Sequence, residues 1–283
     1  MNAVVVTGAS SGIGRATAMM LVQRGFDVYA GARKPADAEA LKAAGGARMH
    51  PIHLDVTDEA SIAAAAQEVS DAVGETGLAG LVNNAGTTAP GPVEYLSLET
   101  FRRQLEVNLV GPLAVTQAML PMLRSGRGRV VNVSSGAGKA AIPLMAPYVT
   151  AKHGLEGLSD VMRLEFGRLG VGVSVIEPGF IATPMGGRLE RDTAEVLESM
   201  PPERREAYAG QLVKLAEQIS GEAEHGSPPE VVAEAILHAL TSRRPRTRYA
   251  AGAGSARLLF LRRVLPDRWF DRIILRTTGL DRV

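Results

Sequence analysis

Short apolar runs alternate with longer stretches rich in alanine and leucine over the first 180 residues. The short runs are apolar at nearly every position, a pattern typical of strands covered on both faces, as in a parallel sheet. They predict strands at Ala3–Thr7, Asp27–Ala32, Arg48–Leu54, Leu78–Asn83, Gly128–Ser134 and Gly172–Glu177. The longer stretches predict helices at Ile13–Arg24, Ala36–Ala44, Asp58–Val73, Leu98–Arg124 and Pro147–Leu169.

This alternation predicts an α/β fold with a doubly wound parallel sheet, because right-handed crossovers place the intervening helices on both faces of the sheet. We expect the strand order 3-2-1-4-5-6, followed by a short seventh strand near Arg248–Ala250. Residues 1–250 are thus predicted to form a single domain. With 46% hydrophobic residues, the chain can bury a substantial core.

Two segments depart from this rhythm. Residues 184–227 are polar, helical in character and interrupted by Pro201-Pro202, and they directly follow a predicted strand. An insertion at the carboxyl end of a strand is well placed to be a lid over a ligand. A pair of surface helices with no part in binding is the alternative. Residues 251–283 mix arginines with apolar residues and are predicted to form a basic amphipathic extension.

Charge is distributed unevenly along the chain. Residues 243–283 contain 11 arginines and 3 aspartates, a net charge of +8, whereas the remainder has 20 basic and 27 acidic groups, a net charge of −7. Such a tail can pack on the acidic body, dock across a partner subunit, cover the mouth of a substrate site, or lie weakly on an anionic membrane surface. Nucleic acid is not an expected partner, because aromatic residues are not interleaved with the basic ones.

Composition excludes several classes of site. Cysteine is absent, which excludes a disulfide framework, a thiolate zinc site and a cysteine nucleophile. The five histidines lack ligand spacing, so we expect no metal. The sequence opens on a predicted strand, and no apolar run reaches the ~18 residues of a membrane-spanning helix. We therefore expect a cytoplasmic protein without a signal peptide.

A glycine-rich loop, Thr7–Gly14, joins the first predicted strand to the first predicted helix. Its spacing suits a tight turn, a close approach of the backbone, and a helix N-terminus aimed at a pyrophosphate. Because the loop lies between a strand and a helix, it predicts a Rossmann-like dinucleotide site. The expected contacts are Gly8, Ser10, Ser11, Gly12, Ile13 and Gly14.

The residues after the second strand bear on the choice of dinucleotide. An acidic residue there would bind the ribose 2′-hydroxyl of NAD. This chain instead has Arg33 and Lys34. The planar fork of an arginine suits a 2′-phosphate, so we predict NADP(H), with Arg33 as the main discriminator and Lys34 and Ser11 as helpers. In the alternative, Arg33 is a solvated loop cation.

Tyr148 and Lys152 are the main catalytic candidates, with Ser135 upstream. Two residues four apart on a helix share one face. A phenol titrates near pH 10, and a nearby ammonium favours the phenolate and lowers that pKa. The hydroxyl of Ser135 can donate a hydrogen bond to a carbonyl oxygen. Together the three residues predict a proton-transfer site that interconverts an alcohol with a ketone or aldehyde, with a bound hydride carrier beside it.

With these motifs in order, the chain resembles the short-chain dehydrogenase/reductase family, of the shorter single-domain type. The likeness covers roughly residues 1–185 and the helix after Pro228. Within the family, Val28–Arg33 and Gly91–Glu94 are similar to the 17β-hydroxysteroid and retinol dehydrogenase branch. The matching pieces are Thr7–Gly14, Asp55, Asn83–Gly86, Asn108, Ser135, Tyr148 with Lys152, and Pro178-Gly179.

The resemblance implies specific catalytic roles. Tyr148 would be the general acid/base, and Lys152 would lower its pKa and hydrogen-bond the nicotinamide ribose. Ser135, which lies 13 residues before Tyr148 as in the family, would polarise the substrate carbonyl. Asn108 would hold a water that links Lys152 to solvent. The alternatives are that Ser134 supplies the active hydroxyl and that Asn108 satisfies a broken helical turn.

The resemblance also implies contacts with the cofactor. Asp55-Val56 would contact the adenine, Asn84-Ala85-Gly86 would line the central groove, and Ile181 and Thr183, just after Pro178-Gly179, would bind the carboxamide. Asp55 could instead lead into the following helix, and Asn84 could stabilise a turn through its own backbone. A homodimer or homotetramer is expected from the resemblance alone.

The substrate pocket should lie beyond the carboxyl ends of the strands. Its expected walls are 87–95, 136–146 and 184–197. The middle wall is apolar apart from Lys139, which favours a small hydrophobic ketone, aldehyde or secondary alcohol over a sugar phosphate.

Overall fold

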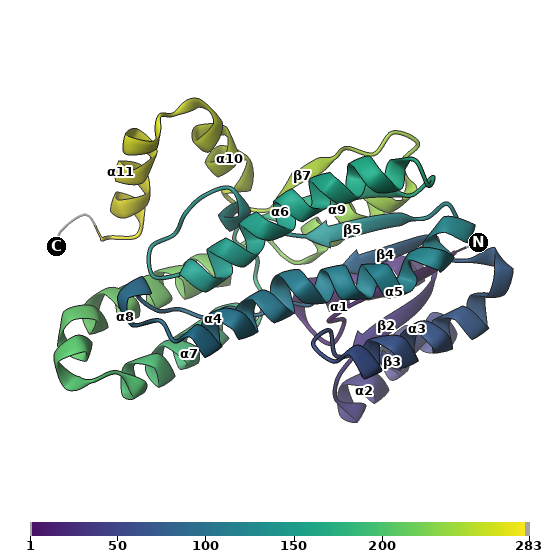
Figure 1. Ribbon diagram of the computed structural model, residues 1–283, viewed down its shortest axis with the longest axis horizontal. Coiled ribbons are helices and arrows are strands. Elements are labelled where there is room, and N and C mark those ends of the chain that lie inside the picture. Colours follow the sequence, from purple (N-terminus) through teal and green to yellow (C-terminus); the bar gives the residue numbers. More distant parts are fainter. Residues whose placement is uncertain (1, 281–283) are drawn as a thin grey trace.

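The computed structural model describes residues 2–280 and contains a parallel sheet of seven strands between two layers of helices (Figure 1). The strand order is β3-β2-β1-β4-β5-β6-β7, which confirms the predicted topology and the seventh strand. Met1 and residues 281–283, which belong to the predicted domain and extension, lie outside the described residues. The strands are β1 (Ala3–Val6), β2 (Asp27–Ala32), β3 (Met49–His53), β4 (Gly80–Asn83), β5 (Arg129–Val133), β6 (Gly172–Pro178) and β7 (Arg248–Ala251).

Both faces of the sheet are buried, as the continuous apolar runs predict. Val4, Val5 and Val6 of β1 are all fully buried. Because successive side chains of a strand point to opposite faces, Val4 and Val6 join one core and Val5 joins the other. The first core packs under α1 (Gly12–Gln23), α2 (Pro35–Gly45) and α9 (Glu230–Thr241). The second packs under α3 (Glu59–Val73), α5 (Gly111–Ser125) and α6 (Ala146–Gly167).

The helix predicted over Leu98–Arg124 is broken, and that prediction is therefore wrong in detail. The structure has α4 (Leu98–Leu105), a π-helical turn (Glu106–Val110) and then α5. The reason is Asn108, whose buried amide pairs with the backbone of a neighbouring loop. A π turn admits one extra residue and so turns a side chain out of the regular helical register.

Residues 184–227 form two helices beyond the carboxyl edge of the sheet. They are α7 (Met185–Ser199) and α8 (Pro202–Glu224), which lie side by side and project away from the main body (Figure 1). Pro201-Pro202 separates them, as expected. The pair packs on the segment that begins α6 through a cluster of apolar side chains, namely Met145, Leu189, Leu215 and Ala216, with Ile142, Leu144, Tyr148, Val149 and Ile219 around them.

The basic extension folds into two helices, α10 (Ser255–Val264) and α11 (Asp267–Thr277). Phe270 and Ile274 of α11 are buried against Ala140, in the loop after β5. The end of the extension also reaches α8, where Lys214 Nζ donates to the Gly279 carbonyl over 2.9 Å. One face of the extension thus packs on the protein's own body. Among residues 2–280, no helix combines the length and the apolar character needed to cross a membrane.

Candidate active site

Hydrogen bonds join the glycine loop after β1 to the segment after β4 at the carboxyl edge of the sheet. Gly8 and Gly12 have φ angles of +62° and +51°, a region that glycine enters without strain. Asn84 Nδ2 donates to the Thr7 and Gly8 carbonyls over 3.0 and 3.1 Å. A Cβ on Gly14 would lie 2.2 Å from the Gly8 carbonyl oxygen. Asn84 therefore fastens the glycine loop rather than only its own turn.

This loop presents the N-terminus of α1 to the outside. The first turn of α1 contains no acidic residue, and the side chain of Ser11 at the N-cap makes no capping hydrogen bond. Backbone amides at such a terminus attract an anion. Thr183, from the loop after β6, lies against the same turn, since a Cβ on Gly12 would be 3.2 Å from its Cβ. The residues present therefore fit a pyrophosphate, and the predicted Gly8–Gly14, Asn84–Gly86 and Thr183 contacts are brought together.

Tyr148 and Lys152 occupy the first turns of α6, on the face that meets the end of β5. Lys152 is 5% exposed, and its Nζ donates to the Val133 carbonyl over 2.9 Å. That Nζ lies 5.8 Å from the centre of the Tyr148 ring. The Ser135 side chain lies close enough to the phenol of Tyr148 to lower its pKa. The three residues predicted from the sequence thus converge at one point.

Electrostatics at Tyr148 differ from the sequence-based expectation. Burial raises the pKa of the phenol, and the side chain of Ser135 lowers it by less. Burial also lowers the pKa of Lys152 to about 8, against the opposing charge of Glu156. The expectation that the ammonium brings the phenol below its ordinary pKa is therefore not met in this structure. At neutral pH the phenol holds its proton and can act as an acid.

The structure distinguishes between the two adjacent serines. Ser135 is half-buried and faces Tyr148, and its Oγ accepts a hydrogen bond from the Ala137 amide over 3.1 Å. Ser134 is 3% exposed, and its Oγ has no hydrogen-bond partner. Ser134 therefore lies beneath the site, and Ser135 is the serine that a substrate can reach.

Asn108 supports the loop beside Lys152. Its Oδ1 accepts from the Thr87 amide over 3.0 Å, and its Nδ2 donates to the Thr87 carbonyl over 2.9 Å. A Cβ on Gly86 would lie 3.1 Å from that Oδ1 and 3.8 Å from Lys152 Nζ. The helical turn at Asn108 is broken, but its amide pairs with the loop at Thr87 rather than with the helix, and the predicted water relay stays a prediction.

The predicted adenine end contains Arg33 and Asp55. The Arg33 side chain is 67% exposed, and its Nη1 lies 4.0 Å from Asp55 Oδ2. Burial acts to raise the pKa of Asp55, but hydrogen bonds from Thr57 and the charge of Arg33 outweigh it and hold that pKa below its ordinary value. Asp55 also leads towards α3, as its alternative role required, because its Oδ1 accepts from the Thr57 amide over 3.0 Å. Val56 is buried in the core.

The segment after β6 is held in place by backbone hydrogen bonds to β7 and to the residues that follow it. The Gly179 amide donates to the Ala251 carbonyl of β7 over 2.9 Å. Ile181 is 6% exposed and packs in the core under α9, so its side chain faces away from the site. Any contact from Ile181 to a ligand would have to come from its backbone.

The family model described as short chain dehydrogenase matches residues 2–194. The chain belongs to the short-chain dehydrogenase family. Retinol dehydrogenase 5 of Mus musculus is 40% identical over 281 residues, covering 96% of this chain and 87% of that protein. The 17-beta-hydroxysteroid dehydrogenase type 6 of Bos taurus is 37% identical, covering 97% and 88%. The predicted branch of the family is thus confirmed, and the chain is a short-chain oxidoreductase.

Solved structures agree with this assignment. A short-chain dehydrogenase from Streptomyces avermitilis superposes with a TM-score of 0.77 at 29% identity, covering 98% of this chain and 95% of that one. A short chain dehydrogenase from Burkholderia cenocepacia J2315, solved in complex with NADP, gives 0.73 at 26% identity, covering 98% and 97%.

Two features of this short-chain dehydrogenase were not predicted from the sequence, namely the contacts of Glu94 and the burial of Glu156. Glu94, after β4, accepts from the Tyr208 hydroxyl of α8 over 2.7 Å, and Arg204 lies 3.6 Å from the same carboxylate. The partners are more than a hundred residues apart, so no local pattern indicated them. Glu156 is buried near Lys152. Its spacing of four residues from Lys152 is a signal that could have found it.

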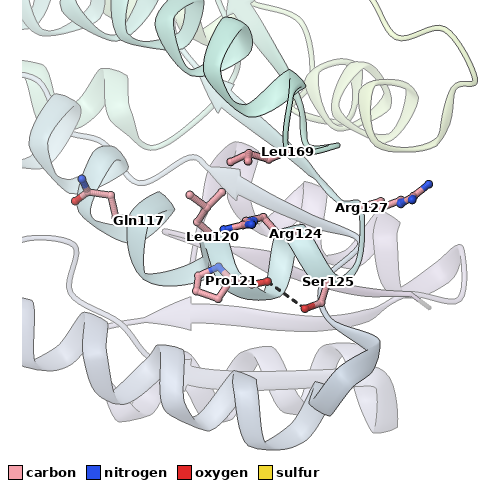
Figure 2. Close-up of a pocket in the computed structure, with 7 residues that line it drawn as sticks. All are labelled: Gln117, Leu120, Pro121, Arg124, Ser125, Arg127 and Leu169. Atoms are coloured by element: carbon pink, nitrogen blue, oxygen red, sulfur yellow. Dashed lines mark hydrogen bonds between the residues drawn. The ribbon is translucent and has the colours of Figure 1, made fainter.

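A concave region lies away from Tyr148. It has a volume of about 640 Å³ and lies at the C-terminal part of α5, near the residues that follow α6 (Figure 2). Its lining residues are Gln117, Leu120, Pro121, Arg124, Ser125, Arg127 and Leu169. Ser125 donates its hydroxyl to the Pro121 carbonyl over 3.3 Å. These residues include no carboxylate, histidine or tyrosine that could act as an acid or base, so we place the chemistry at Tyr148.

Proposed function

We propose that this protein is an NADP(H)-dependent oxidoreductase that interconverts a small hydrophobic ketone or aldehyde with the corresponding alcohol by hydride transfer. The observation that carries the proposal is the convergence of Ser135 and Tyr148 beside a buried Lys152, next to a glycine loop whose shape fits a pyrophosphate. The direction favoured by NADPH is reduction.

When bound, the nicotinamide supplies the hydride that reduces the carbonyl carbon. The Tyr148 phenol donates its proton to the carbonyl oxygen, which becomes the alcohol. Ser135 and Tyr148 are two donors aimed at the charge that develops on this oxygen, and loss of one such donor costs about 2.7–4 kcal/mol of barrier. Lys152 keeps a positive charge beside the resulting phenolate, because its pKa of about 8 leaves it largely protonated at neutral pH. In oxidation the proton moves in the opposite direction.

The change Tyr148→Phe tests this assignment, since it removes only the hydroxyl. We expect kcat to fall by orders of magnitude in a carbonyl-substrate screen monitored by NADPH absorbance, whereas NADPH binding is kept. Turnover close to the parent rate would exclude Tyr148 as the acid. A protein that binds NADP(H) only as a sensor, without catalysis, is the alternative. It predicts no turnover in the parent protein with any carbonyl substrate.

The preference for NADP(H) rests on Arg33 at the end of β2. A charge-assisted hydrogen bond contributes about 1.5–3 kcal/mol, which corresponds to roughly 10- to 100-fold in affinity. We expect Arg33→Ala to raise the KM for NADPH by at least about tenfold and to leave that for NADH nearly unchanged. The change Arg24→Ala, at the far end of α1, is the control. A parent protein that used NADH as well as NADPH would refute the preference.

The hydrophobic substrate is inferred from the surroundings of Tyr148. Its ring packs at the edge of the apolar cluster formed by Met145, Leu189 and Leu215. The names of the related retinol and 17-beta-hydroxysteroid dehydrogenases refer to hydrophobic alcohols, and we propose an alcohol or carbonyl compound of that class here.

We propose that α7 and α8 form the substrate lid. The contact of Tyr208 with Glu94 joins α8 to the loop after β4, and so to the opposite wall of the predicted pocket. The Arg204 guanidinium, 4.1 Å from the centre of the Tyr95 ring, adds a second contact between the same two segments. Both contacts are made by exposed or half-buried side chains, so they can break and re-form when a ligand enters.

The second candidate role is weak attachment to a membrane surface through the extension. While one face of α10 and α11 packs on the body, Phe260 and Trp269 on these helices are 64% and 61% exposed. Exposed aromatic residues among arginines favour an anionic lipid surface. We expect the joint change Phe260→Ser and Trp269→Ser to reduce sedimentation with anionic liposomes, whereas Leu164→Ser, at an equally exposed apolar residue of α6, does not. Equal sedimentation of all variants would refute the attachment.

We also propose that the protein is cytoplasmic and forms a homodimer or homotetramer. Cell fractionation and light scattering of the purified protein test these two statements. A monomer at micromolar concentration would exclude the second.

A further inference from the structure

A buried group of charged residues lies on the helix face that carries Tyr148 and Lys152. Glu156 is 3% exposed and follows Lys152 by one helical turn. Its Oε2 lies 2.9 Å from Lys139 Nζ and accepts a hydrogen bond from Arg248 Nε over 2.9 Å. Its Oε1 has no hydrogen-bond partner.

Lys139 connects this carboxylate to the loop that carries Ser135. The lysine follows directly on the short turn 136–138, which begins at Ser135. That turn packs tightly on α6, since a Cβ on Gly138 would lie 3.0 Å from Glu156 Cγ. The ion pair between Lys139 and Glu156 therefore spans the two segments that supply the serine and the tyrosine of the site.

Arg248 connects the same carboxylate to the strands. Its Nη2 donates to Asp160 Oδ2 over 2.8 Å, and its Nε lies 3.7 Å from Glu177 Oε1. Glu177 directly precedes Pro178-Gly179, where the predicted nicotinamide segment begins. One arginine thus ties α6 to the end of β6.

Stability alone does not explain a buried carboxylate at this position. Removing a charge from water costs several kcal/mol, and well-packed apolar residues often serve the fold equally well. Glu156 does have an effect on the site, because its charge raises the pKa of Lys152 against the effect of burial. The charged groups that face Glu156 are Lys139 from the loop after β5, Lys152 and Asp160 from α6, Glu177 from β6, and Arg248 from β7.

We propose that Glu156 is a positioning residue, which fixes the hydroxyl of Ser135 relative to the phenol of Tyr148 through its ion pair with Lys139. This inference rests on the proposed function, because it assigns a role within the same reaction.

The change Glu156→Gln keeps the shape of the side chain and removes its charge. We expect kcat to fall about 10- to 100-fold, since a misplacement of a reacting group by about 1 Å can cost about 100-fold in rate. The alkaline limb of the pH profile should move to lower pH, since Lys152 then loses its proton more readily. The KM for NADPH should change by less than about twofold. Asp160→Asn is the matched control, because Asp160 also bonds Arg248 but does not contact the Ser135 loop, and its pH profile should match the parent's.

A double-mutant cycle provides a readout that does not depend on activity. We expect the losses in unfolding free energy caused by Lys139→Met and Glu156→Gln, measured by urea denaturation, to be non-additive. We also expect the pH dependence of NADPH binding, measured by fluorescence, to shift in Glu156→Gln but not in Lys139→Met. If Glu156→Gln does not fold, Lys139→Met decides the matter through its kcat, which should also fall because the ion pair to Glu156 is lost. A parent-like kcat and pH profile in the folded variant would overturn the positioning role. Absence of turnover in the parent protein would instead refute the proposed function.

Discussion

The change Gly14→Ala probes the glycine loop most directly. The new Cβ would lie 2.2 Å from the Gly8 carbonyl oxygen and 2.4 Å from Asn84 Nδ2. Side chains do not approach so closely, so the backbone of the loop must move. Overpacking of this kind costs about 1–3 kcal/mol. Loss of the hydrogen bond from Asn84 to Gly8 adds about 0.5–1.5 kcal/mol. We therefore expect a loss of about 1.5–4.5 kcal/mol in the free energy of unfolding.

Gly157→Ala is the matched control, because a Cβ at this exposed helical position meets no atom within 4 Å. The same substitution there should stabilise the fold by about 0.4–1 kcal/mol. Urea denaturation of the two variants measures the difference, and NADPH fluorescence measures the dissociation constant, which we expect to rise at least about tenfold in Gly14→Ala alone, for about 1.4 kcal/mol of lost binding. Parent-like stability and binding in Gly14→Ala would show that the glycine loop tolerates a side chain at this position.

Three further predictions concern the site and its surroundings. Ser135→Ala should lower kcat by about 10²–10³, whereas Ser134→Ala should leave kcat unchanged because the Ser134 hydroxyl has no partner; equal losses in the two would contradict the assignment. Burial raises the pKa of Glu177 to about 7, so ionisation of this group disfavours the folded state and stability falls as the pH rises from about 4.5 through 7. Glu177→Gln should remove this dependence in urea denaturation, and an unchanged pH dependence would exclude it. Tyr208→Phe removes the hydrogen bond to Glu94, and we expect a KM for the substrate raised a few-fold with unaltered stability; an unchanged KM would argue against α8 as a lid.

The expected lowering of the Tyr148 pKa is not met because the sequence does not show how deeply this side chain is buried. Spacing on a helix shows that Tyr148 and Lys152 share a face, but it does not show how much water reaches them. In the folded protein burial dominates both pKa values, raising that of Tyr148 and lowering that of Lys152. Similarly, the apolar pattern over 98–124 did not reveal the π turn, because the pairing of Asn108 with Thr87 joins two separate segments.

Local sequence determined most of the architecture. Runs of β-branched residues, glycine spacing and helical periodicity act over a few residues, so they indicated the strands, their order, the glycine loop and the Tyr148–Lys152 pair. The joining of Glu94 to Tyr208 and the burial of Glu156 between Lys139 and Arg248 were decided only by tertiary structure, whereas the spacing to Tyr148 already favoured Ser135 over Ser134. Each contact depends on which side chains meet across distant segments and on how completely water is excluded there. Neither can be predicted from the residues that are adjacent in the sequence.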